Sequence, residues 1–221
     1  NEPGNESLDY GSKEFGTNNA LILSVGFNYR PGQKYMERPD GKINLGSAWP
    51  IIGFGYEKGI GGFGQLDADF DLLKLRVSDE HSFGMVGRFE WQVSATWFAN
   101  NKFVPFMDWQ HVNTSKVHVM PAGLNRFMAL SYYGASTDRF NVQAHVEHHF
   151  NGFILNKIPL IKKLKWQVVG GFHYLYEPTY GHYYEATVGI ENIFRVIRVD
   201  FVAPFRNNQV QDFTFRFQLG F

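Results

Sequence analysis

Residues 212–221 read D-F-T-F-R-F-Q-L-G-F, a strict alternation of apolar with polar or small side chains. Because successive side chains of a strand point to opposite faces, this period of two predicts a β-strand. A tilted strand of about ten residues is also long enough to cross a bilayer. The apolar positions share one face: Phe213, Phe215, Phe217, Leu219 and Phe221.

The same alternation recurs upstream and predicts a chain made mostly of strands. Phe, Tyr and Trp make up 17% of the residues, and aromatic side chains pack well on a pleated surface. Before 212–221, further strands are predicted at residues 20–30, 48–60, 65–77, 83–98, 124–133, 140–149, 166–174, 183–191 and 197–205.

Two kinds of barrel are built from such strands. A soluble barrel of the lipocalin type turns its apolar face inward, whereas a membrane barrel turns it toward lipid. No apolar run approaches the roughly 20 residues of a membrane-spanning helix. If the protein spans a membrane, it therefore has to do so as a closed barrel. Three features favour the membrane barrel. The apolar face of residues 83–97 is long, the faces opposite the apolar ones carry charges of both signs, and aromatic residues gather near strand ends.

The sequence therefore predicts an all-β fold, a transmembrane antiparallel β-barrel of about ten strands. Residues 1–18 are expected to form an N-terminal segment or loop and residues 19–221 the barrel, in the outer membrane of a Gram-negative bacterium. With residue 221 in the periplasm, 31–47, 78–80, 135–138, 177–181 and 207–211 are expected outside, and 59–64, 100–123 and 151–164 in the periplasm.

Residues 151–166, N-G-F-I-L-N-K-I-P-L-I-K-K-L-K-W, follow H-V-E-H-H-F and resemble a segment of an uncharacterised outer-membrane barrel family. Members of that family carry an N-terminal carboxypeptidase-regulatory-like domain before the barrel. R-P-G-Q-K-Y at 30–35 and G-I-E-N-I-F-R-V at 189–196 resemble the same family, and the likeness runs along most of the chain. Because members are longer, the resemblance implies that these strands are the last ten of about sixteen.

More distantly, residues 189–205 and 212–221 resemble the last strands of the BamA-like surface-antigen superfamily, which inserts or exports proteins at outer membranes. The V-R-G-[FY] motif of that superfamily's lumenal loop does not occur in this sequence, so an insertase activity of its own does not follow. The terminal Phe221, with Phe213, Phe215, Phe217 and Leu219 at alternate positions before it, resembles the signal by which barrel-assembly machinery recognises its clients. The resemblance implies outer-membrane lipid and other outer-membrane or periplasmic proteins and lipoproteins as partners.

His145, Glu147 and His149 alternate along one strand and share a face that should be lumenal. Two imidazoles and a carboxylate can bind zinc with an open fourth position. Steps of about 6.6 Å along a strand are too long for three ligands on one ion unless other strands contribute, and His173 and His182 are candidates. A polar lumen without a metal is the favoured interpretation, and the zinc site is the alternative.

Further charged residues are predicted to face the lumen. The acidic set around residue 69 favours cations or, where opposite charges face it, forms a structural ladder. The set on the last strands is expected to brace the lumen near the closing seam. These lumenal charges are Asp67, Asp69, Asp71, Arg198, Asp200 and Arg216.

Residues 154–165 interleave apolar side chains with lysines. Such a pattern is typical of an amphipathic segment on a membrane surface, and it also suits a docking element for a partner protein. A solvated loop is disfavoured because it would expose several large apolar side chains together. The contact residues predicted for either role are Ile154, Leu155, Ile158, Leu160, Ile161, Lys162 and Lys163.

Composition and motifs exclude several functions. The formal net charge is zero, which leaves no footprint for nucleic acid, and without cysteine there are no disulfides or thiolates. No G-x-S-x-G elbow, phosphate loop or H-E-x-x-H motif occurs, so neither an enzyme nor a cofactor is predicted. The predicted function is an accessory or structural subunit of a multi-protein outer-membrane complex for protein assembly or export. The alternatives are a pore or transporter for small solutes and a lumenal metallohydrolase.

Overall fold

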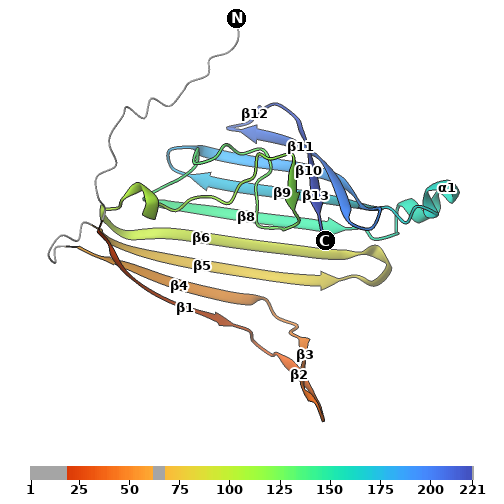
Figure 1. The fold of residues 1–221 in the computed structure, drawn as a ribbon, viewed down its shortest axis with the longest axis horizontal. Coiled ribbons are helices and arrows are strands. Elements are labelled where there is room, and N and C mark those ends of the chain that lie inside the picture. The colour runs from red at the N-terminus through yellow and green to blue at the C-terminus, as the bar shows by residue number, and fades with distance from the viewer. Residues whose placement is uncertain (1–18, 62–67, 221) are drawn as a thin grey trace, which may run out of the picture.

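Figure 1 shows the computed structural model, which describes residues 19–61 and 68–220. The predicted N-terminal segment, residues 1–18, lies outside the described residues, as do Asp67 and Phe221. The helical elements are single turns: η1 (Gly84–Val86), η2 (Phe106–Asp108), η3 (Leu155–Lys157) and α1 (Pro159–Lys162). The strands are β1 (Leu21–Tyr29), β2 (Lys34–Arg38), β3 (Gly41–Gly46), β4 (Ile51–Ile60), β5 (Asp69–Ser82), β6 (Arg88–Phe103), β7 (Val119–Pro121), β8 (Phe140–His149), β9 (Gln167–Glu177), β10 (Gly181–Ile193), β11 (Ile197–Arg206), β12 (Gln209–Val210) and β13 (Thr214–Leu219).

Most strands join one large sheet in the order β1-β4-β5-β6-β8-β9-β10-β11-β13-β7, and β12 pairs with β11. Its pairs are antiparallel except for β13 with β7, and β2–β3 form a separate hairpin. The tight turn after β11 uses Asn207 and Asn208 at φ 48° and 65°, as a two-residue hairpin loop requires. The prediction of an all-β fold with about ten mostly antiparallel strands is confirmed.

The sheet curves strongly but does not close into a barrel (Figure 1). Within the described residues, β1 and β7 are its two ends and do not pair with each other. Closure needs the first strand to meet the last, and part of the outer edge of β13 is already paired with β7. The expected closed barrel is thus an open, curved sheet in this chain.

The predicted strand at 124–133 is wrong. These residues belong to a long connection between β6 and β8, residues 104–139, called the strap below. The strap lies across the sheet over β8 to β10 (Figure 1), and we call the face that it covers the inner face. Phe127, Met128 and Leu130 are all almost fully buried there, so apolar burial does not alternate as it would in a strand.

Without that strand, several connections change ends. Asp69 pairs with Phe103, so the described part of 59–64 and the start of 100–123 lie at the same end as the β11–β12 turn. The other end carries the β5–β6, β8–β9 and β10–β11 connections, the β2–β3 hairpin and the end of β13. Residues 119–121 also reach that other end, beside the C-terminal end of β13. The predicted grouping of 31–47 and 78–80 with 207–211 is therefore wrong, because each misplaced strand reverses the direction of its neighbours.

The distribution of side chains is inverted relative to a protein that folds around an oily core. Arg216 on β13 is 6% exposed, whereas Phe215 beside it is 58% exposed. On β10, Thr187 is 3% exposed and Val188 is 60% exposed. The polar face predicted from alternation is thus the inner, buried face, and the apolar face points outward.

Apolar packing is confined mainly to three small clusters, two of which hold the strap against the inner face. Phe127, Leu130 and Ala135 of the strap pack with Leu175 of β9 and Tyr183 of β10. The second strap cluster joins Met120 and Met128 to Val202 of β11. The third cluster, of Phe70, Leu72 and Phe98, lies where β5 begins and β6 ends. These contacts make the strap part of the fold.

We predict that Phe127→Ala loosens the strap and lowers the free energy of unfolding by about 3–5 kcal/mol, as expected for a buried Phe. The half-exposed Phe103 gives the matched control, whose replacement by alanine should cost less than about 0.5 kcal/mol. Urea titration of refolded protein, with proteolysis of the strap as a second readout, measures both. Equal protease sensitivity of the two variants would contradict a packed strap.

Candidate functional site

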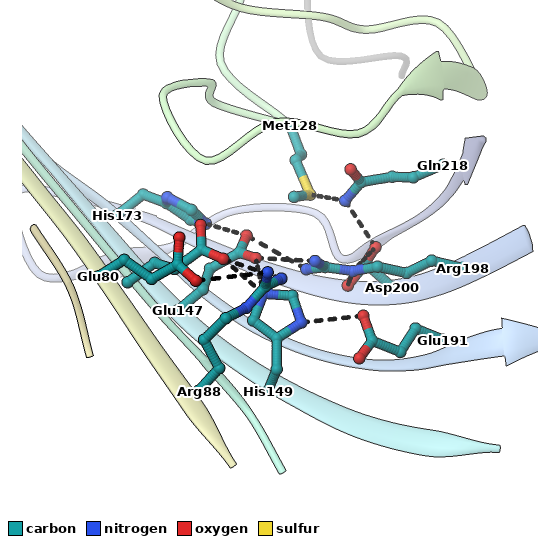
Figure 2. A network of polar contacts seen from close by, with 11 residues as sticks. Glu80, Arg88, Met128, Glu147, His149, His173, Glu191, Arg198, Asp200 and Gln218 are labelled. Carbon is teal, nitrogen blue, oxygen red and sulfur yellow. Dashed lines mark hydrogen bonds and ion pairs between the residues drawn. The ribbon is translucent and has the colours of Figure 1, made fainter. Parts of the chain in front are cut away.

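The inner face carries a buried network of charges centred on Arg198 of β11 (Figure 2). Its Nη1 and Nη2 donate to Glu147 of β8 at 2.8 and 3.2 Å. Its Nε donates to Asp200, two residues along β11, at 2.8 and 3.0 Å. All three side chains are at most 4% exposed, so each charge is desolvated and depends on its partners.

A second branch runs from Glu147 through the histidines of β8. His149 Nδ1 lies 2.9 Å from Glu191 of β10, and its Nε2 lies 3.5 Å from Glu147 (Figure 2). Toward the strap, His145 Nδ1 lies 3.0 Å from Nδ1 of His173 on β9. A hydrogen bond between two such nitrogens needs one donor and one acceptor, so the accepting ring stays neutral.

The predicted lumenal histidines do share the inner face, but the geometry does not gather them around one point. Glu147 is engaged by Arg198, His149 by Glu191 and His145 by His173. His182, the other suggested contributor, points away and lies 2.8 Å from the Tyr174 hydroxyl. Among the described residues, no three His, Cys, Asp or Glu side chains form a group that could hold a metal ion.

The network continues to the C-terminal strand and the strap. Gln218 of β13 donates to Asp200 at 2.8 Å, and its amide also lies 4.0 Å from the Met128 sulfur (Figure 2). Arg216 Nε donates to the Met128 carbonyl at 2.7 Å, and its Nη1 donates to Thr214. Arg198, Asp200 and Arg216 therefore brace the inner face beside the last strand, and the strap is included in that brace.

Glu185 of β10 anchors the strap most directly. Its carboxylate accepts three consecutive backbone N–H groups, those of Met128, Ala129 and Leu130, at 2.7 to 3.1 Å. The Tyr183 hydroxyl donates a fourth hydrogen bond at 2.6 Å. Glu185 is fully buried, and these donors replace the water that its charge would otherwise need.

Sequence reasoning placed Glu185 on a polar strand face but did not assign it a role. The missing information was the partner, because residues 124–133 were expected to pair as a strand. Glu191 and Gln218 were also missed, since their partners, His149 and Asp200, lie on other strands. The only available signal was their position among inward-facing polar residues.

The acidic set on β5 lies elsewhere. Asp71 pairs with Lys58 at 2.8 Å and shares the outer face with Leu73 and Leu75, so the predicted lumenal position is wrong. Asp69 bonds Lys102 at 3.2 Å and Asn100 at 3.0 Å. Register shifts in the β5–β6 pairing begin at this point, and regular alternation from the sequence does not anticipate them. Within the described residues, Asp69 and Asp71 are thus each paired with a lysine.

The predicted docking residues lie in the β8–β9 connection, beyond the strand ends. Ile154 and Ile158 are 39% and 44% exposed, and Lys162 and Lys163 are also exposed. Leu155 and Ile161 are half-buried, while the Leu160 side chain is not among those described. The apolar residues of β13, which are Phe215, Phe217 and Leu219, point outward, and Phe213 just before the strand is also exposed.

Two cavities lie on the inner face toward β1, and the lining of the first is mainly polar. One, of about 380 Å³, is lined by Lys74, Arg76, Gln92 and strap residues including Asn113 and Asn125. The other, of about 500 Å³, lies near Glu80 and Glu90, at the end of the sheet that carries the β5–β6 connection.

Two titratable groups outside the strands are affected by burial. Burial raises the pKa of the Tyr180 phenol, and it raises the pKa of the Asp108 carboxyl in the strap.

The fold and the site define an all-β protein with an ionic inner face and an apolar outer face. A family model described as "Family of unknown function (DUF5686) C-terminal domain" matches residues 1–190, and the chain belongs to that family. The expectation of an uncharacterised family is confirmed, while its description names neither a barrel nor the BamA-like superfamily. No curated protein matches the chain. No helix within residues 19–61 and 68–220 is long and apolar enough to cross a membrane.

We predict that Arg198→Met destabilises the fold by about 3–5 kcal/mol, because it leaves Glu147 and Asp200 buried without their cation. Arg198→Lys should fall between this variant and the wild type, since an ammonium keeps the charge but loses the bidentate geometry. The exposed Arg76→Met serves as the control. Chemical unfolding monitored by tryptophan fluorescence gives all three values, and equal stability of the two methionine variants would refute the central role of Arg198.

Proposed function

We propose that this domain is the membrane-embedded C-terminal part of an outer-membrane β-barrel that acts as a structural or accessory subunit of a complex for protein assembly or export. The observation that carries the proposal is the inverted distribution of side chains. Charged groups such as Arg198, Asp200 and Glu185 are buried, while Phe172, Val188 and their neighbours on the outer face are exposed.

In water such an outer face is unfavourable, because exposed apolar surface costs about 25 cal/mol per Å² relative to burial. In a lipid bilayer the same surface is matched to its surroundings. The outer apolar face of β6 runs from Phe89 to Trp97, about 26 Å along the strand at 3.3 Å per residue. Aromatic residues flank it at both ends, as in the girdles of membrane barrels.

A sheet in lipid has to satisfy all of its backbone hydrogen bonds, so the outer edge of β1 needs a partner strand. We infer that further strands pair with β1 and complete the barrel, in line with the about sixteen strands implied by the resemblance of residues 151–166. The family match to a C-terminal domain is compatible with strands contributed from elsewhere in a longer protein.

The filled interior favours an accessory role over a channel. Beneath β8 to β11 the inner face is occupied by the strap, which Glu185 and Arg216 hold in place. Small or filled barrels serve structural roles and need no open passage. The outward-facing apolar residues of the last strand, which end in Leu219, support recognition by barrel-assembly machinery. Through that machinery the chain would reach its membrane.

A pore for small solutes is the second candidate, supported by the two cavities of about 380 and 500 Å³ toward β1. Conductance of the full-length protein in planar bilayers separates the two functions. No catalytic role is proposed, because Glu147, His145 and His149 are engaged in ion pairs and hydrogen bonds with other strands.

We predict that Val188→Arg is costly only if the outer face contacts lipid. At a lipid-facing position near the midplane, arginine destabilises a barrel by about 2–4 kcal/mol, whereas at a water-exposed position the change is within about 0.5 kcal/mol. Val117→Arg in the strap is the control, since Val117 is similarly exposed at 52% against 60%. Folding into liposomes measures both, and a tolerated Val188→Arg would argue against a membrane-embedded sheet.

Purification of the full-length protein from native membranes in mild detergent tests the accessory role. We expect assembly or export proteins to co-purify in stoichiometric amounts, because a filled barrel acts through its partners. Mass spectrometry of the purified material identifies them. Recovery of the protein alone, together with steady conductance in bilayers, would replace the accessory role with the pore.

A further inference from the structure

The end of the sheet that carries the C-terminal end of β13 has an unusual surface. Residues 150–166, the β8–β9 connection and below the basic segment, contain four lysines and no acidic residue. They also expose apolar side chains, with Phe153 at 42%, Ile154 at 39%, Ile158 at 44% and Leu164 at 51%. Figure 1 shows α1 of this segment projecting past the strand ends.

The neighbouring turns extend the same surface. The Lys165 carbonyl accepts a hydrogen bond from Asn192, which ties the basic segment to the β10–β11 turn. That turn exposes Phe194 at 84%, and the β5–β6 turn on the other side exposes Met85 at 88%. Three successive connections therefore present large apolar side chains at one end, where a water-facing rim would be polar.

The outer face just inside this rim is aromatic. The His148 ring lies 6.2 Å from Phe89 and 4.4 Å from Phe150, centroid to centroid, and Trp166 precedes β9. In a membrane barrel such rings mark the level of the lipid headgroups. The basic segment begins at Phe150, so it emerges at that level.

We propose that the basic segment is an interfacial anchor that binds the anionic phospholipid headgroups at this end of the sheet. Its apolar side chains would enter the headgroup–acyl boundary while its lysines reach phosphate groups, as in amphipathic surface segments. Charge complementarity identifies the occupant, because four lysines without a carboxylate match an anionic leaflet. The apolar rim is also continuous with the outer face that the proposed function places in lipid, on which this inference rests.

Because residues 1–221 contain no cysteine, Leu164→Cys, introduced into full-length protein from which any cysteine outside these residues has been removed, provides a single site for an environment-sensitive dye. The labelled full-length protein is reconstituted in vesicles of phosphatidylcholine alone or mixed equally with phosphatidylglycerol. We expect blue-shifted emission and about two-fold stronger quenching by doxyl lipids in the anionic vesicles. Lys157→Gln with Lys162→Gln and Lys163→Gln should abolish this difference.

A matched triple variant removes exposed lysines elsewhere, Lys34→Gln with Lys42→Gln and Lys116→Gln, and should retain the difference. Alkaline extraction of the same vesicles separates the two hypotheses. An extractable protein would overturn the proposed function and the anchor with it. An inserted protein whose dye emission is the same in both lipids, or whose difference survives the first triple variant, would overturn the anchor alone.

Discussion

The ion pairs of Arg198 are the constraint on which the arrangement of the sheet depends. Glu147 and Arg198 stand on β8 and β11, with β9 and β10 between them. Three strand spacings in a flat sheet amount to about 14 Å, beyond easy reach of these two side chains. Their contact at 2.8 Å therefore requires a sheet that curves around its inner face. The same guanidinium also neutralises Asp200, so curvature and charge balance are satisfied together.

From this centre the network extends to β8, β9, β10 and β13. His149 links β8 to Glu191 of β10, and Gln218 of β13 links to Asp200. Glu185 and Arg216 then hold the strap through its backbone groups, which have no strand partner of their own at Met128. Buried charges of this kind are tolerated only when fully paired, and their pairing specifies the path of the chain. The N-terminal strands β1 and β4 lack such a filling and border the open cavities.

The inner ionic face and the outer apolar face have one origin. Alternation along a strand puts Arg216 and Phe215 on opposite faces whatever the surroundings are. The buried network selects the polar face as the inner one, which leaves the apolar row exposed. The proposed membrane environment accounts for that row, and the proposed lipid anchor extends the argument to the strand ends.

Much of the sheet could be predicted from the sequence, because the alternation of apolar and polar residues along a strand can be recognised in a short stretch of sequence. Strands such as β1, β8 and β13, and the shared face of His145, Glu147 and His149, follow from it directly. The bulged region near Asp69 and the strap could not be predicted, since a register shift depends on the neighbouring strand. Residues 124–133 were mistaken for a strand because the contacts that bury their apolar residues come from β9, β10 and β11, which lie far away in the sequence. The sequence by itself thus determined which side chains share a face. Only the tertiary structure decided which face is inside, where each connection lies, and which partner each buried charge finds, because those outcomes depend on contacts between distant strands.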